Sequence, residues 1–255
     1  MSAAVKAWLE REGRLLRLRL ARPKANVLDA AMVAALDGAL VSHADMPGLV
    51  GILLDHDGPN FSFGASVEEH LPAQCAAMLK DFHALILRLA RSPAPVMTVV
   101  RGQCLGGGLE VALAGSFIFA APDARLGQPE IVLGVFAPAA SALLPARVGQ
   151  ARAEDLLFSG RVVTAEEARA IGLVDTVADD PEAAALAWFE RHLAPRSASS
   201  LRHAVKAARG GFARDLAVRL GELEELYLNG LMTTRDAREG LEAFLAKRSA
   251  RWEHR

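Results

Sequence analysis

Residues 95–130, PVMTVVRGQCLGGGLEVALAGSFIFAAPDARLGQPE, decide the fold that we expect for this chain. The β-branched run Val96–Val100 predicts a buried strand, which Gly102 ends. Three consecutive glycines, residues 106–108, then open a short apolar helix, and residues 117–121 predict a second strand. A strand, a helix and a strand in this order are typical of an α/β fold.

The glycines also indicate a place for chemistry. The first backbone N–H groups of a helix have no partner within the helix, and glycine lets a carbonyl oxygen approach them without meeting a Cβ. Such donors stabilise an oxyanion. Glu110 lies just inside this helix and Glu130 follows a separate turn, so both carboxylates could serve paired acid–base catalysis. The alternative is that the glycines allow tight packing and that both glutamates are solvated.

Other sequence motifs do not fit. A Rossmann fingerprint needs a third glycine where this chain has Val111, and a P-loop needs Lys followed by Ser or Thr where it has Gly108 and Leu109. No G-x-S-x-G elbow is present. The histidines form no closely spaced pair, and Cys75 and Cys104 are too few for a disulfide framework or a zinc site. We therefore predict no metal site.

The composition is that of a globular protein. The chain has 255 residues, of which 52% are hydrophobic, and its formal net charge is −1. This supplies a core and gives no reason to expect nucleic acid or a membrane surface as a partner. The low cysteine content, the lack of an apolar targeting segment and the lack of a long uncharged apolar run predict a cytoplasmic location.

Periodicity predicts the remaining elements. Leu alternates with Arg over Leu15–Leu20, as in a half-buried strand, and the apolar run at 49–54 predicts a buried one. No strand pattern follows Pro181, so a boundary near residue 180 would divide an α/β core, residues 1–180, from a helical region, residues 181–255. Helices are expected at 29–40, 74–91, 140–159, 164–172, 181–193, 199–209, 216–228 and 234–247.

Together with three further motifs, the central stretch resembles the signature of the crotonase (enoyl-CoA hydratase/isomerase) superfamily. Residues 61–67, FSFGASV, resemble the F-x-x-G-A-D-I/V loop of that family. Residues 161–168, RVVTAEEA, and 172–175, GLVD, are similar to its downstream segment, in the same order along the chain. The resemblance implies a crotonase-like spiral of ββα units with a helical C-terminal region.

The same resemblance implies catalytic roles for four residues. The backbone N–H groups of Ala65 and Gly107 would form the oxyanion hole for a thioester carbonyl. Glu110 and Glu130 would correspond to the pair of glutamates that hold and activate water in hydratases of the family. Isomerases of the family generally lack one of these, so the presence of both favours hydration. Coenzyme A would be part of the substrate, and no cofactor is implied.

Five other positions would shape substrate binding. Lys24 stands where the family often contacts a CoA phosphate, and Ser66 and Val67 belong to the oxyanion loop, with Ser66 replacing the usual Asp. Phe136 and Pro138 stand where typical hydratases have small residues beside the acyl group. A bulky, rigid wall favours a planar ring over a straight acyl chain.

We therefore predict a hydratase that adds water 1,4 across a cyclic dienoyl-CoA thioester, as a branch of the family does in the anaerobic degradation of aromatic compounds. The alternatives are an ordinary enoyl-CoA hydratase or isomerase and a non-catalytic acyl-CoA-binding protein. The resemblance also implies a homotrimer or a pair of trimers, with residues 181–255 contributing to the subunit contacts. The sequence does not reveal which glutamate is the acid and which is the base.

Overall fold

The computed structural model describes residues 3–43 and 46–255, so residues 1–2 and 44–45 of the predicted core lie outside the described residues. The strands are β1 (Val5–Glu10), β2 (Leu15–Leu20), β3 (Gly51–His56), β4 (Val96–Val100), β5 (Gln103–Leu105), β6 (Phe117–Ala120), β7 (Arg125–Gly127), β8 (Val162–Thr164) and β9 (Thr176–Val177). The α-helices are α1 (Ala30–His43), α2 (Cys75–Ala90), α3 (Gly107–Ala114), α4 (Pro138–Val148), α5 (Gln150–Ser159), α6 (Ala165–Ala170), α7 (Pro181–His192), α8 (Ala198–Glu225) and α9 (Arg235–Leu245).

A mostly parallel sheet forms the centre of the fold. Its strand order over the described residues is β1-β2-β3-β4-β6-β9, and only the β1–β2 pair is antiparallel. Helices α1, α2 and α3 each connect one parallel strand to the next, as parallel neighbours require. A smaller sheet consists of β5, β7 and β8. The α/β prediction is confirmed, with β1, β5, β7 and β8 as strands that the sequence patterns did not indicate.

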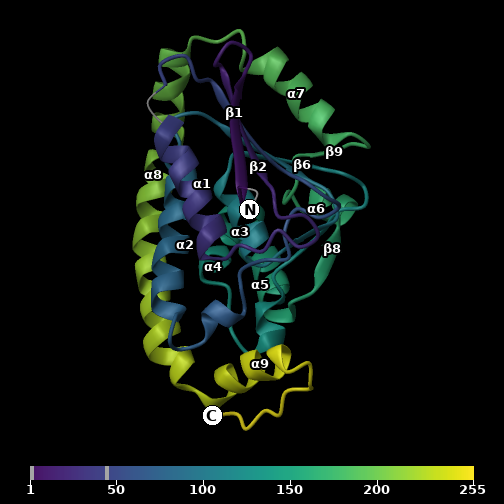
Figure 1. Ribbon diagram of the computed structural model, residues 1–255, viewed down its shortest axis with the longest axis vertical. Helices are drawn as coiled ribbons and strands as arrows, with labels where there is room; N and C mark the ends of the chain where they lie inside the picture. Colours follow the sequence, from purple (N-terminus) through teal and green to yellow (C-terminus); the bar gives the residue numbers. More distant parts are fainter. Residues whose placement is uncertain (1–2, 44–45) are drawn as a thin grey trace.

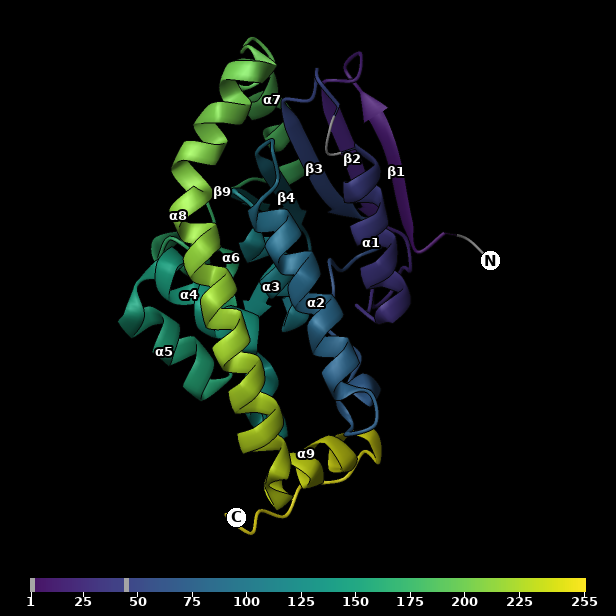
Figure 2. The same ribbon diagram turned by 90° about the vertical axis from the view of Figure 1, so that its left-hand side faces the viewer.

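The two faces of the large sheet are covered by different helices (Figures 1 and 2). Leu16 and Leu18 of β2 belong to the core cluster that includes Leu36 of α1. Leu15 points the other way and packs in a second cluster with Phe189 of α7. This alternation is the normal consequence of the two-residue period of a strand.

Three helix predictions were wrong in their boundaries. The helix expected at 140–159 is divided into α4 and α5 at Gly149, whose φ of +77° is incompatible with a continuous right-handed helix. Conversely, the helices expected at 199–209 and 216–228 are one helix, α8, which runs through Gly210 and Gly211. The long helix packs against α2 and α4 (Figure 2). This packing offsets the low helix propensity of glycine. The division at residue 180 stays a prediction.

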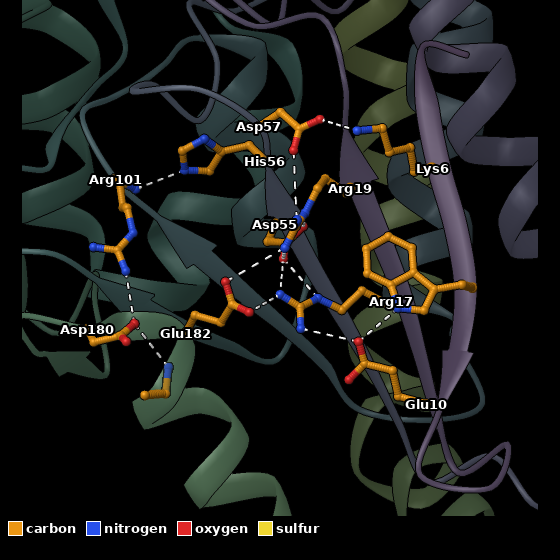
Figure 3. A network of polar contacts seen from close by, with 12 residues as sticks. Lys6, Glu10, Arg17, Arg19, Asp55, His56, Asp57, Arg101, Asp180 and Glu182 are labelled. Atoms are coloured by element: carbon orange, nitrogen blue, oxygen red, sulfur yellow. Dashed lines mark hydrogen bonds and ion pairs between the residues drawn. The ribbon is translucent and has the colours of Figure 1, made fainter. Parts of the chain in front are cut away.

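The half-buried character predicted for β2 was also wrong, because Arg17 is only 3% exposed. Figure 3 shows its guanidinium among the carboxylates of Asp55 on β3, Glu182 on α7 and Glu10 on β1. Arg19 also donates to Asp55, with Nε 2.7 Å from Oδ1. The charges therefore lie between the sheet and α7 as a paired network, in which burial is tolerated.

Replacement of Asp55 by Ala should destabilise the fold by about 3–5 kcal/mol, because it leaves Arg17 buried without its main partner. The matched control is Asp57→Ala, which removes partly exposed ion pairs with Lys6 and Arg19 at the rim of the network and should cost at most about 1 kcal/mol. Urea unfolding of the two variants measures both free energies. Equal losses would show that the network is not a determinant of stability.

Candidate active site

The predicted oxyanion loop, residues 61–67, lies beside the glycine turn that begins α3. The backbone N–H of Ser62 donates to the carbonyl of Gln103, and the N–H of Leu105 donates back to the carbonyl of Ser62. These bonds align the loop with β5, which leads directly into residues 106–108. The two segments are far apart in the sequence, and these bonds hold Ala65 of one next to Gly107 of the other.

The absence of side chains at the glycines is what permits this approach. A Cβ on Gly107 would stand 3.0 Å from the backbone nitrogen of Ala65, closer than ordinary packing allows. A Cβ on Gly106 would collide with Oε1 of Glu130. The loop that contains Ala65 and the carboxylate of Glu130 therefore both lie directly against the start of α3. The glycines do allow tight packing, but what they pack against are the predicted oxyanion loop and a predicted catalytic carboxylate.

Glu110 lies in the first turn of α3 and is 5% exposed. Its Oε1 accepts a hydrogen bond from the backbone N–H of Ala140 at 2.7 Å. Ala140 lies in the first turn of α4, which begins at Pro138, so the N–H is one of those without a partner inside its own helix. The carboxylate is therefore fixed by its neighbour helix, and the prediction of solvated glutamates is excluded for it.

Glu130 lies in the short 3₁₀ helix η2 (Pro129–Leu133), which follows β7. The side-chain amide of Gln128 is 1% exposed, and with its nitrogen directed at Glu130 it donates to Oε1 at 3.2 Å and to Oε2 at 3.0 Å. Gln128 was noted in the sequence only as part of the turn. It now appears as the side chain that orients the second carboxylate.

Burial controls the protonation of this pair. Loss of solvent raises the pKa of Glu110, partly offset by hydrogen bonds from the backbones of Ala140 and Ala139. Loss of solvent also raises the pKa of Glu130, and the nearby negative charge of Glu110 raises it further. Two such carboxyls tend to share one proton near neutral pH. One proton donor and one proton acceptor are what paired acid–base chemistry needs.

Both glutamates open into one cavity between the oxyanion loop, α2, η2 and the start of α4. The predicted site residues Ala65, Val67, Gly107, Phe136 and Pro138 line it as well. The cavity wall otherwise consists mainly of apolar side chains from α2, η2 and α9. These include Met78, Leu79, Phe82, Leu133 and Leu241.

Two predicted binding residues are not among the described residues that line this cavity. Lys24 is exposed on a turn. The carbonyl of the next residue, Ala25, accepts the N–H of Phe63, so Lys24 lies near the oxyanion loop. Ser66 contributes its backbone carbonyl to Nδ1 of His70 at 2.7 Å. A contact of either side chain with coenzyme A stays a prediction.

The sequence interpretation missed three residues around the site. His70 and His83 were expected to have a core or surface role rather than a metal role, yet both line the cavity. Tyr227, in the π-helical turn that follows α8, is fully buried and packs edge-on against Phe136 at 5.2 Å between ring centroids. The position of His83 on the apolar face of α2 was a sequence signal that could have indicated a buried histidine near the site. The pairing of Tyr227 with Phe136 joins residues too distant in sequence to be read from it.

The described residues contain no group of three or more His, Cys, Asp or Glu side chains arranged to hold a metal ion. No helix among residues 3–43 and 46–255 is long and apolar enough to cross a membrane.

Sequence and structure comparisons place this site within a known family. The family model "Enoyl-CoA hydratase/isomerase" matches residues 10–255, and the chain belongs to this family. A crystal structure of an enoyl-CoA hydratase from Mycobacterium avium subsp. paratuberculosis K-10 is similar, with a TM-score of 0.85, 25% identity and coverage of 98% of each chain. The predictions of a crotonase fold and of family membership are thus confirmed.

A particular relative is much more similar. The chain is 61% identical to the cyclohexa-1,5-dienecarbonyl-CoA hydratase of Thauera aromatica over 254 residues, which cover 100% of this chain and 98% of the relative. A probable enoyl-CoA hydratase of Rhizobium meliloti (strain 1021) is 34% identical, with 97% of each protein covered. Of these two relatives, the chain is therefore more similar to the cyclohexa-1,5-dienecarbonyl-CoA hydratase.

The raised pKa of Glu130 predicts a pH-dependent stability difference. Between the ordinary pKa of about 4.3 and the higher value of the folded state, only the unfolded chain gives up the proton, so stability falls as pH rises. Glu130→Gln lacks this titration. Its Tm relative to wild type should therefore rise by roughly 2–4 °C or more between pH 5 and pH 8.

Thermal unfolding over that pH range measures the difference, with Glu68→Gln, an exposed position, as the control that should show no such trend. A Tm difference for Glu130→Gln that does not change with pH would contradict the raised pKa.

Proposed function

We propose that this protein hydrates cyclohexa-1,5-diene-1-carbonyl-CoA by 1,4-addition of water, in the anaerobic degradation of aromatic compounds. The observation that carries the proposal is the pair of carboxylates, Glu110 buried and Glu130 half-buried, beside the closely approaching backbones of Ala65 and Gly107. The high identity to the Thauera enzyme over the whole chain supports the choice of substrate. A cytoplasmic location stays a prediction from cysteine content.

The arrangement supplies each step of the reaction. Water held between the glutamates gives a proton to the ionised carboxylate while its oxygen attacks the β carbon. The electrons move through the diene to the thioester oxygen, where the N–H groups of Ala65 and Gly107 stabilise the negative charge. The protonated carboxyl then delivers its proton to the far carbon of the diene. The product is 6-hydroxycyclohex-1-ene-1-carbonyl-CoA, and the pair ends with one proton, as it began.

The cavity wall explains a preference for a ring. Phe136 is supported from behind by the ring of Tyr227, which cannot move because it is fully buried. Pro138, also buried, begins the helix whose Ala140 N–H holds Glu110. The wall beside the acyl group is therefore stiff and is coupled to the catalytic carboxylate. A stiff wall orients a planar substrate at little entropic cost.

The cyclic dienoyl-CoA should be hydrated with a kcat/KM at least about 100-fold above that for crotonyl-CoA, since misplacement of a reacting group can cost that factor. Loss of the absorbance of the conjugated thioester measures both rates. A preference for crotonyl-CoA would make the protein an ordinary enoyl-CoA hydratase. Binding of both thioesters without turnover would make it an acyl-CoA-binding protein.

Glu110→Gln and Glu130→Gln should each lower kcat by about 10²–10⁴-fold with little change in KM, because glutamine keeps the size and polarity of the side chain but moves no proton. Gln128→Glu is unsuitable as a control because it adds a charge to the site. Glu68→Gln serves instead and should retain wild-type kcat, because Glu68 is exposed. Near-full activity of either active-site variant would remove that residue from the mechanism.

We also propose that the protein is a homotrimer or a pair of trimers. Not every apolar residue of the C-terminal region is available for such contacts: Leu216, Leu220 and Leu223 are buried within the chain, because α8 packs against α2 and α4. Other apolar side chains remain exposed on η2, on α5, on β8 and in the C-terminal region. These are Ile131, Val132, Phe158, Val162, Val218, Leu226 and Phe244. Exposed large apolar side chains are typical of subunit contacts where they gather on one surface.

Light scattering should give a mass of three or six chains, and Phe158→Glu, which changes a side chain that is 72% exposed, should lower it. Val41→Glu, at an exposed position on α1, is the control that should leave the mass unchanged. The mass of a single chain at micromolar concentration would contradict the proposal.

A further inference from the structure

A buried histidine on the cavity wall has one ring nitrogen without a partner. His83 lies on α2, lines the cavity together with Glu110 and Glu130, and is 3% exposed. Its Nε2 is buried and has no hydrogen-bond partner, although buried polar atoms normally have one. The mechanism described above does not use this residue.

The other ring nitrogen fixes the chemical character of the free one. Nδ1 of His83 is hydrogen-bonded to the carboxylate of Glu224, which reaches it from α8 (Figure 2 shows α2 and α8 side by side). A carboxylate can only accept, so Nδ1 carries the proton. Burial lowers the pKa of His83, more than Glu224 raises it, which keeps the ring neutral. Nε2 is therefore a buried lone-pair acceptor on a residue that lines a mostly apolar cavity.

An acceptor in this position needs a donor, and the substrate diene brings none. The only O–H donor that the proposed reaction brings to the acyl group is the water that adds to the β carbon. One hydrogen of that water moves to a glutamate, and the other stays on the oxygen as the hydroxyl of the product. In an apolar cavity this second hydrogen costs free energy unless an acceptor receives it.

The other titratable side chains that line the cavity have hydrogen-bond partners. The hydroxyl of Tyr227 is also buried without a partner, but Tyr227, which packs against Phe136, is not among the described residues that line the cavity. Oε1 of Glu110 accepts from Ala140, and the carboxylate of Glu130 accepts from Gln128. His70 also lines the cavity with Nδ1 bonded to a backbone carbonyl, but Nε2 of His70 is not among the buried atoms that lack a partner. Among the described residues that line the cavity, His83 thus differs in having a buried acceptor without a donor.

We propose that His83, oriented by Glu224, is a specificity-determining residue that accepts a hydrogen bond from the hydroxyl group at the β carbon of the acyl ring. It holds the hydrogen that is not transferred, and so directs the oxygen of the attacking water toward the ring. Glu224 acts through His83 as a positioning residue. The proposal rests on the proposed function, because it takes the hydroxyl group from that reaction.

Direct binding of two saturated thioesters tests this assignment without turnover. The probes are cyclohexanecarbonyl-CoA and 2-hydroxycyclohexane-1-carbonyl-CoA, which differ only in the β-hydroxyl group. All proteins carry Glu130→Gln so that the hydroxylated probe is not dehydrated, and isothermal titration calorimetry gives each Kd. In this background the hydroxylated probe should bind about tenfold more tightly, as expected for one buried hydrogen bond.

Adding His83→Leu should abolish this preference while the Kd for cyclohexanecarbonyl-CoA stays within about twofold, because leucine fills similar space without an acceptor. His83→Gln, which restores an acceptor oxygen, should recover part of the preference. Glu224→Ala should weaken it, because Nδ1 loses the partner that fixes its proton. His70→Leu, a change of the second histidine of the cavity, should leave the preference intact.

The proposal is overturned if the preference persists in His83→Leu, if both probes weaken equally there, or if His70→Leu rather than His83→Leu abolishes it. It is also overturned if the Glu130→Gln protein shows no preference. Failure of the proposed function looks different: neither thioester binds, or wild-type enzyme does not hydrate the cyclic diene. Tight binding with no effect of His83→Leu would leave that function standing.

Discussion

The close approach of two chain segments, the oxyanion loop and η2, to one glycine turn is the constraint on which the site depends. Glu130 lies against Gly106, Ala65 against Gly107, and Ser62 against Gly108, where a Cβ would stand 2.7 Å from the Cβ of the serine. Any side chain at these positions would separate elements that the β4–β5–α3 connection brings together. The same absence of side chains leaves the first N–H groups of α3 open to a ligand.

Close packing at this turn has an electrostatic consequence. It removes water from Glu110 and Glu130, so the ionised forms are disfavoured and the two carboxyls titrate as a pair. Backbone N–H groups from α4 and the amide of Gln128 compensate part of this cost. The apolar wall around them has a second effect, because it strengthens every interaction with the developing oxyanion. Packing, protonation and catalysis thus follow from one geometry.

Sequence patterns predicted what depends on short-range order. The strand Val96–Val100, the glycine turn and the paired glutamates lie within one continuous stretch, and local signals specify them. The start of α1 was equally local, since Asp29 accepts the N–H of Met32 at 2.9 Å. What could not be predicted depends on partners far along the chain. Arg17 is buried because Asp55 pairs with it, and His83 lines the cavity with Nδ1 held by Glu224, 141 positions away. Neither pairing leaves a periodic signal in the sequence.

The central claim is that Glu110 and Glu130 share one buried proton at neutral pH. Infrared difference spectroscopy of the carboxyl C=O stretch, in H₂O and D₂O, reports protonated buried carboxyls directly. The account predicts one such protonated carboxyl in the wild type at pH 7. In each Glu→Gln variant the remaining carboxyl should ionise at lower pH than in the pair, because the like-charged neighbour is gone. Two ionised carboxylates in the wild type at pH 7 would contradict the account.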